Sequence, residues 1–275
     1  MDSAGHHRLE DLTQIGDWSQ NHVKDSFELD LVWAKPTLPH SEGWGISKFM
    51  LMEIVAALLC VLVFIPMARR LRGGRVPAGR FWNLFEAILV FIRNTIARPV
   101  IGEHDADRFL PYLWTAFFFI LFNNLLGMVP FGAAATASYE TTGALALCTF
   151  LAVHGSGMIK MGPVGYLKSM VPHVPIMLWP LIFVIELIGH LAKSFALCVR
   201  LFANLYGGHM VATVMLAFIV LLANTHSSWF WVVAPGSVIG VILFSLLDLF
   251  VAFLQAYIFT FLSAVFIGMA VHPHH

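Results

Sequence analysis

Five long apolar runs constrain this chain more than any other feature of its sequence. They cover residues 49–67, 109–129, 142–161, 176–223 and 238–270. About 20 apolar residues suffice for a helix to cross a bilayer. Lipid offers backbone groups no hydrogen-bond partner, so an open chain can cross it only as helices. Only 12% of the 275 residues are charged, against about 25% in a typical soluble domain. We therefore predict an all-α polytopic membrane protein with about five membrane-crossing helices.

The segments around the first run indicate the orientation of the chain. Residues 1–46 are polar and mixed, and we expect an extramembrane N-terminal arm followed by a single membrane domain over 47–275. A basic cluster follows the first run and consists of Arg69, Arg70, Arg72 and Arg75. By the positive-inside rule that end is cytoplasmic, so the N-terminus lies outside. Five crossings then place the C-terminus in the cytoplasm, and a bacterial plasma membrane is our preferred location.

Residues 80–99 differ from the five runs. Apolar residues recur there at three- and four-residue spacing, namely Phe81, Phe85, Ile88, Leu89 and Ile92. Polar residues interrupt the other faces, which is typical of an amphipathic helix lying at a membrane surface. We predict one such interfacial helix, followed by a polar turn at 102–108. A second loop is expected at 131–141, and it carries Glu140.

The last two apolar runs are too long for straight crossings, so they must tilt strongly, bend or break. Gly207 and Gly208 offer a plausible break in the first of them. A short polar turn at 224–228 joins the two runs, which predicts an antiparallel hairpin over 176–270. For two residues that face each other in such a hairpin, the average of their residue numbers is the same all along the hairpin. Arg200 and Gln255 average 227.5, and His209 and Asp248 average 228.5, so we expect each pair to lie close together.

Ionisable and amide side chains are concentrated in this hairpin. They are Glu186, His190, Lys193, Arg200, Asn204, His209, Asp248 and Gln255. A charge at the bilayer centre costs about 2.5–3.5 kcal/mol on insertion scales, so such residues are functional candidates. Arg200 cannot avoid this cost by losing its proton. A histidine beside a carboxylate suits proton transfer.

Two other interpretations of this cluster remain open. The residues could be buried ion pairs that set the helix register. His190, His209 and Asp248 could instead be three metal ligands, although no dense ligand motif such as HExxH is present.

Several of these stretches resemble the F-type ATP synthase subunit a family. The stretch at 194–210, SFALCVRLFANLYGGHM, matches the family signature at Arg200, Leu201, Asn204 and Gly208. Residues 254–270 resemble the last helix of the family, with its glutamine at Gln255, and 124–130 resemble the end of its second span. Glu186 falls on a family acidic position. The resemblance covers roughly residues 48–270.

This resemblance implies a stator subunit of a rotary ATP synthase. Two offset half-channels would carry protons to and from the carboxylates of a ring of c-subunits, coupling proton flow to ring rotation and ATP synthesis. Arg200 would be the essential charge facing the ring carboxylate. The proton pathway would be formed by Glu186, His190, Asn204, His209, Asp248 and Gln255. The partners implied are the c-ring, the peripheral-stalk b subunits and, through the stalk, the catalytic head, with no nucleic acid.

One departure from the family pattern concerns the predicted pair. Many bacterial members have a glutamate where this chain has His209, and a histidine where it has Asp248. The base and the acid are exchanged at two positions that the hairpin places together, as expected for a preserved pair.

Two other classes of protein compete with this assignment. A stand-alone proton-coupled secondary transporter often has internal repeats and broken helices in paired positions, and neither the repeat nor the pairing is evident. An intramembrane enzyme needs a nucleophile beside a base or a dense histidine motif, and the sequence has neither. We therefore expect a non-catalytic subunit without a cofactor or a metal.

Overall fold

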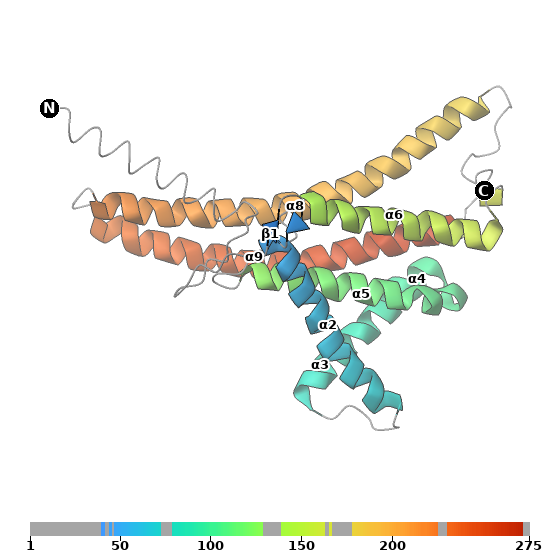
Figure 1. Cartoon of the computed structure of the whole chain (residues 1–275), viewed down its shortest axis with the longest axis horizontal. Coiled ribbons are helices and arrows are strands. Elements are labelled where there is room, and N and C mark those ends of the chain that lie inside the picture. The colour runs from blue at the N-terminus through green and yellow to red at the C-terminus, as the bar shows by residue number, and fades with distance from the viewer. Residues whose placement is uncertain are drawn as a thin grey trace. The chain divides into compact units, whose positions relative to one another are not determined.

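The computed structural model describes residues 40–41, 44–45, 47–72, 79–128, 139–162, 165–166, 178–224 and 230–271. Two short strands, β1 (His40–Ser41) and β2 (Trp44–Gly45), pair antiparallel. The helices that follow are α2 (Lys48–Arg72), α3 (Arg80–Phe91), the π-helical segment η1 (Ile92–Ala97), α4 (Arg98–Ile101), α5 (Glu103–Met128), α6 (Tyr139–Met161), α8 (Trp179–Asn224) and α9 (Phe230–Val271) (Figure 1). The predicted all-α class is confirmed.

Four stretches of the described chain are long and apolar enough to cross a membrane. They are Lys48–Arg69, Glu103–Met128, Glu140–Met161 and Val233–Val271. The fifth expected crossing corresponds to α8, a continuous helix of 46 residues that contains the shorter apolar stretch Pro180–Gly189. Almost all of the predicted arm at 1–46 lies outside the described residues. The division into 1–46 and 47–275 therefore stays a prediction.

The described residues group into two compact units. The first unit draws on Met1–Val55, Asn123–Ser138 and Phe202–Phe253, and the second on Ala56–Phe122, Tyr139–Leu201 and Leu254–His275. The helices α2, α5, α8 and α9 contribute residues to both units.

In the second unit, α5 and α6 form an antiparallel pair. Near the start of α5, the Lys160 ammonium lies 2.6 Å from the Asp105 carboxylate. Two turns further along α5, the Tyr112 hydroxyl lies 2.8 Å from the Thr149 hydroxyl. These pairs have nearly the same mean residue number, 132.5 and 130.5, as expected for helices joined by a short connection.

Aromatic side chains join α2, α3 and α5 in the second unit. Phe118 of α5 is fully buried. Its ring centroid lies 4.7 Å from that of Phe64 in α2 and 5.6 Å from that of Phe85 in α3. This contact places the predicted interfacial helix against the spans, with Phe85 buried and Phe81 exposed.

The C-terminal half of α9 carries a row of small residues. Ala256, Thr260, Ala264 and Gly268 recur every four residues and are all buried. Small side chains at this spacing let helix backbones approach closely within a membrane. The approach is closest at Gly268, where an added Cβ would lie 2.5 Å from the Val100 carbonyl oxygen of α4. This row is visible in the sequence as a four-residue period, and it positions the end of α9.

The predicted turn at 102–108 is wrong. Gly102 alone breaks the helical path, with a φ of +99° that favours glycine. Helix α5 then begins at Glu103 and carries Glu103 and Asp105 in its first turn. Acidic side chains at this position interact favourably with the positive end of the helix dipole. Similarly, α6 includes Glu140, which we expected in a loop.

Two expectations about the long helices also fail. Gly207 and Gly208 do not break α8, which is helical through both. A helical glycine costs about 0.5–1 kcal/mol relative to alanine, and of the two only Gly208 packs against α9, at Asp248. Helix α9 begins at Phe230 rather than at residue 238 and includes Pro235. Pro235 is the sixth residue of α9 and removes one intrahelical hydrogen bond, the one to the carbonyl four residues earlier.

Candidate functional site

All predicted site residues lie on α8 and α9. The structure describes the side chains of Glu186, Arg200, Asp248 and Gln255. For His190, Asn204 and His209 it describes only the helical backbone. The roles of these three side chains, and the metal alternative that uses two of them, therefore stay predictions.

The Asp248 carboxylate packs directly on the backbone of α8. A Cβ added at Gly208 would lie 2.6 and 2.8 Å from the two carboxylate oxygens of Asp248. The missing side chain of Gly208 thus provides the space that the half-buried carboxylate occupies. His209 is the next residue of α8, but its side chain is not described, so the His209–Asp248 pair stays a prediction.

A second contact has the same register. A Cβ added at Gly240 would lie 3.7 Å from the Met215 sulfur. The residue numbers of Gly208 and Asp248 average 228, and those of Met215 and Gly240 average 227.5, close to the averages of the two predicted pairs, 227.5 and 228.5. Within the first unit, the end of α8 and the start of α9 therefore form the predicted antiparallel hairpin, and they run side by side in Figure 1.

An asparagine on α5 holds α9 one turn beyond Asp248. The Asn124 side-chain amide donates a hydrogen bond of 3.3 Å to the Ala252 carbonyl. Asn123 and Asn124 are both fully buried. Two adjacent amides inside an apolar run are visible in the sequence, but their role in positioning α9 was not predicted.

Arg200 lies on an exposed, largely apolar face of α8. Its side chain is exposed, as are those of Phe195 and Val199, at 69% and 43%. Among the residues that the structure describes, none forms a hydrogen bond or an ion pair with Arg200. Gln255 is buried in the same unit, with 3% of its surface exposed, and no hydrogen bond joins it to Arg200.

Glu186 precedes Arg200 on α8 and is half-buried. Exposed apolar side chains flank it, such as Ile185 at 58%. Within the described chain, no group of three His, Cys, Asp or Glu residues is arranged to hold a metal ion.

Comparison with known proteins identifies the family. The family model described as ATP synthase A chain matches residues 50–268. ATP synthase subunit a of Myxococcus xanthus (strain DK1622) is 42% identical over 231 residues, which is 84% of this chain and 74% of that protein. ATP synthase subunit a 2 of Chlorobaculum tepidum is 38% identical over 263 residues, covering 93% of this chain and 73% of that protein.

ATP synthase subunit a of Anaeromyxobacter sp. (strain Fw109-5) is 45% identical over 228 residues, or 82% of this chain. The match spans only 54% of that relative's length. The family model matches most of the length of this chain. The chain therefore belongs to the ATP synthase A chain family, as its resemblance to subunit a of F-type ATP synthases predicts.

Proposed function

We propose that this chain is the proton-translocating stator subunit of a rotary ATP synthase. It would conduct protons through two offset half-channels to and from the carboxylates of a c-ring. Membership of the ATP synthase A chain family supports this function. The observation that carries it is the exposed Arg200 guanidinium, which has no partner within the described part of the chain.

The chemistry follows from the charge of Arg200. An opposite charge at contact distance favours the ionised form of a carboxyl group by about 1–4 kcal/mol. A ring carboxylate passing Arg200 therefore releases its proton there and regains one only after moving to the other half-channel. The fixed charge also repels protons that would leak directly between the channels.

The remaining site residues form the proton path in this proposal. Glu186, His190, His209 and Asp248 line the half-channel on the outer side, while Asn204 and Gln255 orient Arg200 or a water molecule beside it. The packing of Asp248 at Gly208, next to His209, supports a His–carboxylate relay.

The proposed partners and location follow from the same function. The chain contacts the c-ring and the peripheral-stalk b subunits, and the stalk connects it to the catalytic head, where ATP chemistry takes place. The chain itself catalyses no reaction. It lies in a bacterial plasma membrane with its N-terminus outside and its C-terminus in the cytoplasm.

The test uses membrane vesicles that contain the assembled complex. Arg200→Ala should abolish ATP-driven acidification while subunit content stays normal, because the ring carboxylate loses its counter-charge. Arg200→Lys should restore little pumping, since a buried ammonium can lose its proton. Arg80→Ala removes an exposed arginine outside the site and should pump normally. Coupled pumping by the Arg200→Ala complex would overturn the proposal.

A further inference from the structure

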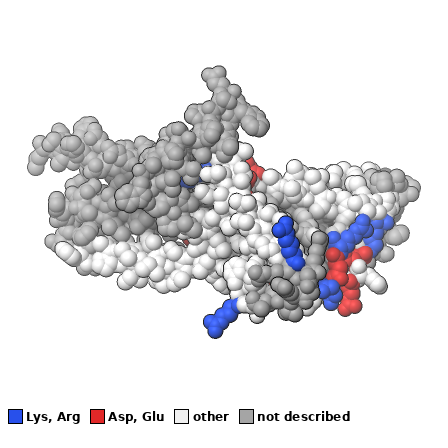
Figure 2. Space-filling model, turned by 60° about the horizontal axis from the view of Figure 1, so that its bottom comes forward, with Lys and Arg blue, Asp and Glu red and all other residues white. Residues whose placement is uncertain are grey.

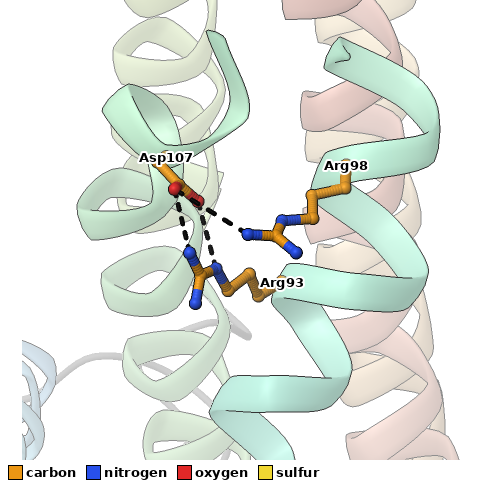
Figure 3. Close-up of polar contacts among 3 residues, drawn as sticks. All are labelled: Arg93, Arg98 and Asp107. Atoms are coloured by element: carbon orange, nitrogen blue, oxygen red, sulfur yellow. Dashed lines mark hydrogen bonds and ion pairs between the residues drawn. The ribbon is translucent and has the colours of Figure 1, made fainter. Parts of the chain in front are cut away.

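A charged corner lies where α4, α5 and α6 meet in the second unit. We define it by Arg93, Arg98, Asp105, Asp107 and Lys160. Asp107 accepts hydrogen bonds of 3.1 Å from Arg93 Nε and 2.9 Å from Arg93 Nη2 (Figure 3). Asp105 pairs with Lys160 at 2.6 Å. Each carboxylate thus has its own cation, and Arg98 is a surplus positive charge.

The surplus charge is visible in the distances around Asp107. Arg98 Nη2 lies 4.0 Å from the Asp107 carboxylate, which is beyond hydrogen-bond range. The two bonds to Arg93 satisfy this carboxylate. Hydrogen bonding to Asp107, with the attraction of its charge, raises the pKa of Arg93 above its usual value. Asp107 therefore stabilises the charged form of Arg93.

The π-helical segment η1 brings the two arginines to one side of the helix. The Arg98 N–H bonds to the Arg93 carbonyl, five residues earlier. In a regular α-helix of 3.6 residues per turn, the side chains of residues five apart point about 140° away from each other. The i to i+5 hydrogen bond of a π-helix brings such residues one above the other. Pro99 explains the segment, because it lacks an N–H and its ring clashes with the carbonyl four residues earlier.

The Arg98 guanidinium has an unused donor. Its Nε is buried and has no hydrogen-bond partner among the described residues. The side chain as a whole is 37% exposed, so a ligand can reach it from outside. A buried N–H without an acceptor costs about 1–3 kcal/mol, and a planar guanidinium matches the paired oxygens of a phosphate group.

The surface near this corner is apolar and uncovered by the rest of the second unit. Helix α3, which leads into η1, exposes large side chains, namely Phe81, Leu84, Val90 and Phe91, at 45–58%. Figure 2 shows acidic and basic side chains close together at one end of the view, beside a broad surface of uncharged residues. A basic group beside such a surface fits a ligand with an anionic head and an apolar body.

We propose that Arg98 binds the phosphate of an anionic phospholipid. Its two terminal nitrogens donate to phosphate oxygens, because the side chain is partly exposed while Nε is buried, and the acyl chains cover exposed apolar side chains of α3. Free phosphate offers the same oxygens but would leave those side chains uncovered. The proposal stands independently of the proton pathway, because it involves none of the site residues on α8 and α9.

The test titrates phosphatidylglycerol into the purified assembled complex and counts bound lipid by native mass spectrometry. Arg98→Gln should weaken binding about fivefold or more, as expected for loss of one cation at a membrane surface. Arg98→Lys should retain part of the affinity, because it keeps the charge without the planar fork. The matched control is Arg108→Gln, which removes another exposed cation from the start of α5 and should bind lipid as the parent complex does.

Three outcomes would overturn the proposal. The first is equal phosphatidylglycerol binding by the parent and Arg98→Gln complexes. The second is displacement of the lipid by millimolar inorganic phosphate, which would identify a free-phosphate site. The third is loss of another subunit from the Arg98→Gln complex with unchanged lipid binding, which would show that Arg98 contacts an acidic residue of a partner protein.

Discussion

At Gly208 the absence of a side chain leaves the space in which the Asp248 carboxylate packs. This glycine is helical, so it is required for space and not for an unusual φ. An added Cβ would meet both oxygens and the Cγ atom of Asp248 at 2.6–2.9 Å. The preceding residue, Gly207, has no atom within 4 Å of the same position. Two adjacent glycines in one helix therefore have different roles, and Gly207 serves as a control for Gly208.

We predict that Gly208→Ala impairs proton pumping. The new methyl group must displace the Asp248 carboxylate or separate the hairpin, and such overpacking costs about 1–3 kcal/mol. ATP-driven acidification by the assembled complex should fall several-fold. Gly207→Ala should pump normally, since alanine is the better helix former. Equal pumping by the two variants would mean that the carboxylate position is unimportant.

At the scale of the element, α9 is held by contacts at separate points along its length. In the first unit, its Ala252 carbonyl accepts a hydrogen bond from Asn124. In the second unit, its row of small residues ends at Gly268, against the Val100 carbonyl. Backbone atoms cannot move aside as a flexible side chain can, so the contact at Gly268 restricts the helix strongly.

Gly268→Ala should therefore destabilise the protein, by about 1–3 kcal/mol. The expected result is a lower midpoint of thermal unfolding in detergent, followed by circular dichroism. Gly236 also lies in α9 and has open space around it. Gly236→Ala should leave the midpoint unchanged or raise it slightly, because it removes a helical glycine. Identical midpoints for the two alanine variants would contradict this account of the α4–α9 contact.

At the scale of the whole molecule, the proposed function makes this chain one component of a larger assembly. Its sequence has 16 basic and 16 acidic residues, and the charged corner pairs two carboxylates with cations. Arg200 differs, because it is exposed and has no described partner. In the proposed function, this exposed charge is the one that faces the carboxylates of the c-ring.

The isolated chain should accordingly be inactive. Reconstituted alone in liposomes, it should neither hydrolyse ATP nor conduct protons above the rate of empty liposomes, and Arg200→Ala should make no difference. Within the assembled complex the same substitution should abolish pumping. A proton flux through the isolated chain that disappears in Asp248→Asn would instead support a stand-alone transporter.

The sequence by itself determined the helices and the hairpin of this protein. Bilayer thickness and the rise of an α-helix define the length of each crossing, and the apolar runs report that length directly. The turn after Asn224 likewise predicted the register at which Asp248 meets α8. Local errors occurred at single residues such as Gly207 and Pro235, which stay helical, because the context of a long helix overrides the propensity of one residue.

Only the tertiary structure decided which groups on different helices meet. The contact of Asp248 with Gly208, the hydrogen bond from Asn124 to Ala252 and the convergence of Arg93 and Arg98 on Asp107 each join residues with no shared local pattern. Helical periodicity predicts the face of the helix on which a residue lies, but not which other helix packs against that face. The neighbour depends on how closely backbones approach, and in this protein that approach is governed by small residues and one π-helical segment.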